Sequence, residues 1–143
     1  FTMLPNAVVY ADVTIGDSVT LYSGVSVRNG AQIHDRVTIH DGSVIGADGF
    51  GYTPDAKLGL RKVPQLGNVV IESDVADGVV VGGGAGIADH VSISKGVRLG
   101  GRAGVISSIT EPGDYMGFPA LPANEWRRIQ VTQRRMARPH RKK

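Results

Sequence analysis

Aliphatic residues recur every six positions over the first third of the chain. The series is uninterrupted and consists of Val9, Ile15, Leu21, Val27, Ile33, Ile39 and Ile45. An α-helix would repeat its apolar face about every 3.6 residues and an amphipathic strand every second residue, so this spacing fits neither. A period of six is typical of a parallel β-helix of hexapeptide repeats, in which three short strands and three corners make one triangular coil.

A second set of residues keeps the same period. Four positions after six of these aliphatic residues the chain has a small or branched residue: Val13, Val19, Val25, Ala31, Val37 and Ser43. The six-residue spacing returns further along at Val81, Ile87, Ile93, Leu99 and Val105. We predict that the aliphatic residues of both series point into one prism core, and that the smaller residues fit beneath the next coil.

Two segments interrupt the period. Residues 46–68 are rich in glycine and contain Pro54 and Pro64, which predicts a loop extruded from the prism. The step from Ile71 to Val81 is ten residues rather than six, which predicts a smaller bulge at 72–80 or a shift of register. The fold class is therefore all-β, and we assign residues 1–110 to the β-helix.

The second region, residues 111–143, has a different pattern. Its first part, residues 111–123, contains three prolines, which predicts an irregular exit from the prism. Asn124 is suited to cap a short α-helix over residues 125–138. In that helix the apolar residues that share one face are Trp126, Ile129 and Met136.

Charge is distributed unevenly between the two regions. Residues 121–143 contain eight Lys or Arg against one Glu, a formal charge of +7, whereas residues 1–120 contain eight against twelve, a charge of −4. A basic tail of this kind can meet nucleic acid, an anionic membrane or an acidic protein. Nucleic acid is disfavoured, because the tail lacks interleaved aromatic residues.

Composition excludes several other classes. The chain has no cysteine, so it contains neither disulfides nor a thiolate metal site. No apolar stretch is long enough to cross a bilayer, and we predict no transmembrane segment. The first residues lack the charged and long apolar regions of a signal peptide, so we expect a cytoplasmic protein.

The extruded loop is more specific than the repeats. The segments VIGADGFGY at 44–52, KVPQLG at 62–67 and VVI at 69–71 closely resemble the UDP-3-O-acylglucosamine N-acyltransferases of lipid A biosynthesis. The segments EPGDYMGFPA at 111–120 and WRR at 126–128 resemble the end of the same family. This resemblance implies a left-handed β-helix, which the sequence pattern alone does not specify, and a homotrimer.

The resemblance also implies a reaction. A 3-hydroxyacyl chain would move from the phosphopantetheine of acyl carrier protein to the 2-amino group of a UDP-linked, O-acylated glucosamine, with no other cofactor and no metal. The chemistry requires a base that takes a proton from the attacking amine and donors that stabilise the oxyanion. A histidine suits the first role, because its ordinary pKa lies near neutrality.

His90 is the candidate catalytic base. The family's histidine follows an Ile-Ala pair directly, whereas here Asp89 takes that place and His90 comes one position later. In a strand one position reverses the direction of a side chain. The null hypothesis for His90 is a solvated corner histidine.

The other site residues follow from the loop and the tail. Asp48, Phe50 and Tyr52 are the candidate substrate-binding residues, although the two aromatic residues could equally pin the loop onto the prism. Arg127, Arg128, Arg134 and Arg135 are the candidate surface for acyl carrier protein, which is acidic.

Two alternatives remain open. The chain begins at the first coil, without the family's N-terminal uridine-binding domain, and has about two coils fewer, so a non-catalytic trimeric scaffold is one alternative. The other is a γ-class carbonic anhydrase, whose zinc would need three histidines gathered across a trimer interface. His34, His40 and His90 supply that number but form no recognisable motif, and His34 and His40 are expected at exposed corners.

Overall fold

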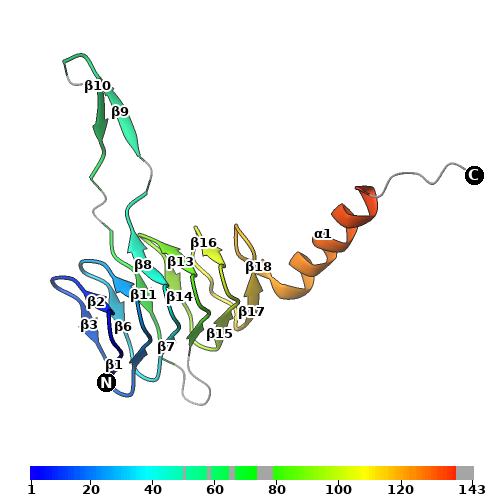
Figure 1. Cartoon of the computed structure of the whole chain (residues 1–143), viewed down its shortest axis with the longest axis horizontal. Coiled ribbons are helices and arrows are strands. Elements are labelled where there is room, and N and C mark those ends of the chain that lie inside the picture. The colour runs from blue at the N-terminus through cyan, green and yellow to red at the C-terminus, as the bar shows by residue number, and fades with distance from the viewer. Residues whose placement is uncertain (50, 58, 65–66, 74–78, 138–143) are drawn as a thin grey trace, which may run out of the picture.

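The computed structural model describes residues 1–49, 51–57, 59–64, 67–73 and 79–137. They form a left-handed parallel β-helix with three faces, from which a hairpin and a C-terminal helix project (Figure 1). The fold class predicted from the six-residue period is therefore confirmed. Over the described residues, no helix has the length and apolar character needed to span a membrane.

Each face of the prism is one sheet, and we name the faces by their strands. The seven-stranded face consists of β1 (Thr2–Met3), β4 (Thr20–Leu21), β7 (Thr38–Ile39), β12 (Val80–Val81), β15 (Val97–Leu99), β17 (Gly113–Met116) and β18 (Leu121–Pro122). The five-stranded face consists of β2 (Val8–Val9), β5 (Ser26–Val27), β8 (Val44–Ala47), β13 (Gly86–Ala88) and β16 (Gly104–Val105). The four-stranded face consists of β3 (Thr14–Ile15), β6 (Gln32–Ile33), β11 (Val70–Ile71) and β14 (Ser92–Ile93).

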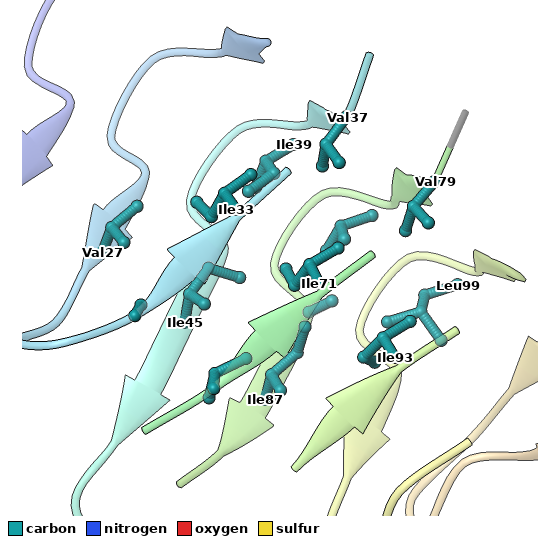
Figure 2. Packing of buried hydrophobic residues seen from close by; sticks show 14 of the residues in the cluster. Val27, Ile33, Val37, Ile39, Ile45, Ile71, Val79, Ile87, Ile93 and Leu99 are labelled. Atoms are coloured by element: carbon teal, nitrogen blue, oxygen red, sulfur yellow. The ribbon is translucent and has the colours of Figure 1, made fainter. Parts of the chain in front are cut away.

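The predicted core residues stack directly on one another from coil to coil. Ile33 pairs in register with Ile15 on one side and Ile71 on the other. Figure 2 shows side chains such as Ile33, Ile71 and Ile93 from successive coils pointing into one common core. Ser43 is fully buried among them, and its hydroxyl donates to the carbonyl oxygen of Gly82 at 3.0 Å, which satisfies its polar atom.

Two of the twelve predicted core residues are not fully buried. Val9 and Ile15 are only partly buried, whereas the other ten are at most 3% exposed. Both belong to the first coil, which has a neighbouring coil on one side only. The prediction is wrong for these two because the six-residue period does not reveal which coil ends the stack.

Both interruptions of the period are insertions that leave the register intact. The extruded loop contains an antiparallel hairpin, β9 (Tyr52–Asp55) and β10 (Gly59–Lys62), which we call the arm and which projects from the end of β8 (Figure 1). After the arm, Ile71 and Val81 pair with Ile33 and Ile39, which lie six residues apart. The ten-residue step is therefore a bulge and not a shift of register. Residues 74–78 of this bulge lie outside the described residues.

The exit from the prism is more regular than its prolines predict. β17 adds a parallel strand to β15, and β18 turns back antiparallel on β17. The position of the domain boundary after residue 110 stays a prediction.

The C-terminal helix, α1 (Ala123–Met136), begins two residues earlier than expected. Pro122 is the N-cap residue, and Asn124 lies inside the first turn, where its side-chain oxygen accepts from the Glu125 N–H at 2.8 Å. Asn124 is therefore not the cap, because the two antiparallel strands lead straight into the helix. Residue 138, the predicted last residue of the helix, lies outside the described residues.

The apolar face of α1 packs only at its start. Trp126 lies against Gly117, where a Cβ would overlap the indole ring, and Ile129 is partly buried. Met136 is 80% exposed, because the helix leaves the prism after its first turns (Figure 1). The apolar face was expected to pack against the prism or a neighbouring subunit; for Met136 the first is wrong within a single chain, and the second stays a prediction.

Candidate functional site

The five-stranded face has a column of outward-pointing residues that changes character halfway along. In register the column is Val8, Ser26, Val44, Gly86 and Gly104, so the last two coils have no side chain at this position; Gly86 is partly exposed, whereas Gly104 is buried. At the corresponding positions the other two faces have only side chains. The missing side chains leave an open groove of about 360 Å³, which we call the glycine groove.

The walls of the glycine groove come from three parts of the chain. The extension of β8 supplies Asp48 and Gly49, and the last coil supplies Arg102 and Ile106. Phe118 from the exit segment closes one side, and its ring lies so close to Gly104 that a Cβ there would overlap it. Phe118 is 77% exposed and Ile106 59% exposed, so the groove offers an apolar surface to a ligand.

The backbone N–H groups on the floor of the groove already have hydrogen-bond partners. The N–H of Gly86 donates to the carbonyl of Ala103, and the N–H of Gly104 donates to the carbonyl of Gly117, both at 2.9 Å. The N–H of Gly100, a conceivable oxyanion donor, is also occupied by the carbonyl of Tyr115 at 2.8 Å. A ligand would therefore find no free N–H donor at these glycines, and the ring of Phe118 already covers Gly104.

His90 lies at the corner that follows β13, next to the groove residue Ala88. Its Nδ1 is 2.8 Å from Oδ2 of Asp89, whose side chain is only 11% exposed, while the His90 side chain is 59% exposed. Because an ionised carboxylate can only accept, this contact favours a proton on Nδ1, so that the neutral form of the imidazole has its lone pair on Nε2. The pair is thus a base held in one tautomer by a nearly buried acid.

The backbone at His90 has the conformation of a corner rather than that of a strand. Its φ is 60°, the left-handed conformation of a corner, so strand alternation does not set its side-chain direction. Gly67, at the return of the arm, lies on the imidazole, and a Cβ there would overlap the ring. The ring is therefore fixed by Asp89 at its edge and by Gly67 on its face.

Two of the predicted substrate-binding residues, Asp48 and Tyr52, lie in different places. Asp48 lines the groove, whereas Tyr52 is 46% exposed on β9, away from it. Phe50 lies outside the described residues. The Lys62 ammonium donates to the carbonyl of Gly49 at 3.0 Å and lies 5.9 Å from the centre of the Tyr52 ring, so it links the root of the arm to the edge of the groove.

His34 and His40 do not join this site within one chain. His34 is exposed after β6, as predicted. His40 follows β7 and was also expected to be exposed, but it is partly buried because it stacks on Tyr22, with ring centres 4.6 Å apart. Among the described residues no group of three potential ligands could hold a metal ion.

Sequence reasoning missed Gly86, Gly104, Arg102 and Phe118. Gly86 and Gly104 each precede a core residue, Ile87 or Val105, so the period marks them as outward-facing. Their alignment becomes visible only when the coils are placed in register. Phe118 has no sequence signal that places it over Gly104.

The stacked coils and their six-residue repeats define the class of protein. Residues 12–47 match the family model described as bacterial transferase hexapeptide, six repeats. The chain is therefore a hexapeptide-repeat protein, and its sequence is related to UDP-3-O-acylglucosamine N-acyltransferases, as the loop motif suggested.

Two relatives illustrate the relationship. The probable UDP-3-O-acylglucosamine N-acyltransferase 2, mitochondrial, of Arabidopsis thaliana is 48% identical over 65 residues, which cover 43% of this chain and 21% of that protein. The UDP-3-O-acylglucosamine N-acyltransferase of Bordetella avium is 30% identical over 154 positions, which cover 67% of this chain and 43% of that protein. The chain thus spans less than half the length of these relatives. The second alignment is longer than the part of this chain that it covers, so that relative contains residues with no counterpart here.

Solved structures agree on the fold. The N-acyltransferase AntD from Bacillus cereus, in complex with dTDP and 3-hydroxybutyryl-CoA, has a TM-score of 0.64 at 16% identity and covers 94% of this chain and 79% of its own. Soybean serine acetyltransferase has a TM-score of 0.59 at 26% identity and covers 77% of this chain and 40% of its own.

Proposed function

We propose that this chain is an N-acyltransferase that moves an acyl group from a carrier thioester to the amino group of a UDP-linked, O-acylated glucosamine. The observation that supports this most is the Asp89–His90 pair at the corner that directly follows Ala88, a residue that lines the apolar groove. The relatives' names supply the substrate classes. The expected cytoplasmic location belongs to the same proposal.

The chemical step follows from the free nitrogen of His90. The acceptor amine attacks the thioester carbonyl while Nε2 of His90 takes the amine proton, so that a C–N bond forms. The C–S bond then breaks and the proton passes to the departing thiolate, which gives an amide and a free thiol. Asp89 keeps the imidazole in the required tautomer and stabilises its charged form during the step.

Release of free thiol tests the proposal directly. We expect thiol release from the acyl carrier thioester only when the UDP-amino-sugar is present, because the amine and not water is the nucleophile. Omission of the acceptor is the matched control. If a folded chain releases thiol at the background rate with both substrates present, the non-catalytic scaffold is the better description.

We further propose that the chain assembles as a homotrimer. On the described part of α1, Val131 is 48% and Met136 80% exposed, and these apolar side chains would pack between chains. Light scattering at micromolar concentration should report three chain masses. Met136→Asp should lower this mass if the helices meet, and a monomeric parent chain would contradict the proposal.

The basic face of α1 is the proposed docking surface for acyl carrier protein. Arg127, Arg128, Arg134 and Arg135 are all exposed, and a cationic surface accelerates the association of an acidic partner. Replacing the four with Gln should weaken carrier binding while leaving the trimer intact. Binding should also weaken as salt rises, because the Debye length shrinks to about 8 Å at physiological ionic strength. Unchanged binding by the variant would exclude this surface, and equal binding of a random DNA duplex would indicate a non-specific tail.

A further inference from the structure

Arg102 lies at a corner whose equivalents in the preceding coils of the same face are glycine or asparagine. The corners that precede the strands of the five-stranded face all have positive φ, and their residues are Asn6, Gly24, Gly42, Gly84 and Arg102. Arg102 has a φ of 60°, a conformation that costs free energy in any residue with a β-carbon. On this face Arg102 therefore places a long cationic side chain at a corner that is glycine in the three preceding coils.

The side chain of Arg102 stands beside the glycine groove. It is exposed and lines the groove together with Gly84, where a Cβ would lie 3.6 Å from the Arg102 Cγ. Neither the Asp89–His90 pair nor the Arg98–Asp114 pair involves Arg102. Its guanidinium is therefore a cation at the edge of an apolar surface.

The strands determine at which end of the groove this cation lies. Gly84 and Arg102 precede β13 and β16, whereas Ala88 and Ile106 lie at the other ends of these parallel strands. The step from Gly84 to Ala88 spans roughly 13 Å at the rise of an extended strand. His90 follows Ala88, so the cation and the proposed base lie toward opposite ends of the groove.

We propose that Arg102 binds the phosphate of the phosphopantetheine arm that delivers the acyl group; this rests on the proposed function. The arm is a thin linear chain with a thioester at one end and a phosphate at the other. The floor suits such a chain, because a Cβ on Gly86 would meet nothing within 4 Å and the space above it is open. A guanidinium is the side chain best matched to phosphate, since it donates two parallel hydrogen bonds. The thioester would then lie toward His90.

Equilibrium binding without turnover tests the proposal. The probes are 4′-phosphopantetheine and pantetheine, which differ only in the phosphate, titrated into the full chain by calorimetry. We expect the phosphorylated probe to bind at least tenfold more tightly. Arg102→Gly should abolish this difference and leave the affinity for pantetheine unchanged, because glycine fits the positive φ of the corner.

Arg36→Gly is the matched control. Arg36 is also exposed at a corner with a φ of 58°, but it precedes β7 on another face, so the substitution makes the same change of charge and backbone freedom away from the groove. This variant should keep the preference for phosphate. Gly86→Leu should weaken both probes equally by filling the groove. A preference that survives in Arg102→Gly, or a parent chain that binds the two probes equally or binds neither, would overturn the proposal.

Two further comparisons distinguish a failure of the Arg102 proposal from a failure of the proposed acyltransferase function. A chain that prefers the phosphorylated probe but releases no thiol would refute the transferase activity and leave the Arg102 site intact. Coenzyme A and holo acyl carrier protein present the same phosphopantetheine, so Arg102→Gly should weaken both. Only the carrier should lose further affinity in the four-arginine variant of α1, which identifies the carrier as the source of the arm.

Discussion

Replacing His90 with Gln should lower kcat for acyl transfer by about 100-fold or more and leave KM nearly unchanged. The magnitude is that of losing a positioned general base, which contributes roughly 10² to 10⁴. Gln keeps polarity and similar bulk at the corner but cannot take up the amine proton. The measurement is the rate of thiol release at saturating carrier thioester and acceptor. A variant with the parent rate would remove His90 from the mechanism.

Two neighbouring substitutions sharpen this test without touching the base. Asp89→Asn removes the acid that holds Nδ1–H, and Gly67→Ala puts a methyl group where the imidazole lies. Both should lower kcat less than the His90 change does, because each disturbs only the tautomer or the placement of the ring. If Asp89 and Gly67 only maintained the fold, both variants would lose stability in denaturation experiments and would not change kcat selectively.

Replacing Ile33 with Ala should lower the free energy of unfolding by about 2–5 kcal/mol, the usual cost of truncating a buried aliphatic side chain. Ile33 is 1% exposed and is covered by a coil on each side, so little relaxation can fill the cavity. Ile15→Ala is the matched control, because it makes the same substitution in the column of Ile33 but in the end coil, which has a neighbouring coil on one side only. Its smaller cost should be visible in the midpoint of chemical unfolding. Equal costs at the two positions would contradict the assigned end of the stack.

The core residues of the prism could be predicted because each one is marked by its own six-residue repeat. Each regular coil repeats the same steric requirement, so the inward aliphatic residues mark the strands of these coils, although not those of the arm or of the exit. The register after the arm was not predictable in the same way. The ten-residue step between Ile71 and Val81 allows a bulge or a shift, and only the pairing with Ile33 and Ile39 decides between them.

The candidate site was predictable only in part, because it depends on contacts between coils. His90 could be selected by residue type. Its left-handed φ and its contacts with Asp89 and Gly67 depend on the folded backbone and cannot be read from the sequence. Gly86 and Gly104 resemble ordinary repeat glycines until the register places them side by side. Met136 was assigned to a packed face because helical periodicity cannot say how far a neighbouring surface extends.

The most direct test of the central claim is to follow the acyl group itself. The full chain is mixed with one equivalent of carrier protein bearing an isotopically labelled 3-hydroxyacyl thioester and an excess of the UDP-amino-sugar, and the products are analysed by mass spectrometry. An acyltransferase with the Asp89–His90 base should convert the label into a UDP-sugar amide, and His90→Gln should leave it on the carrier. Label that stays on the carrier with the folded parent chain as well would contradict the claim.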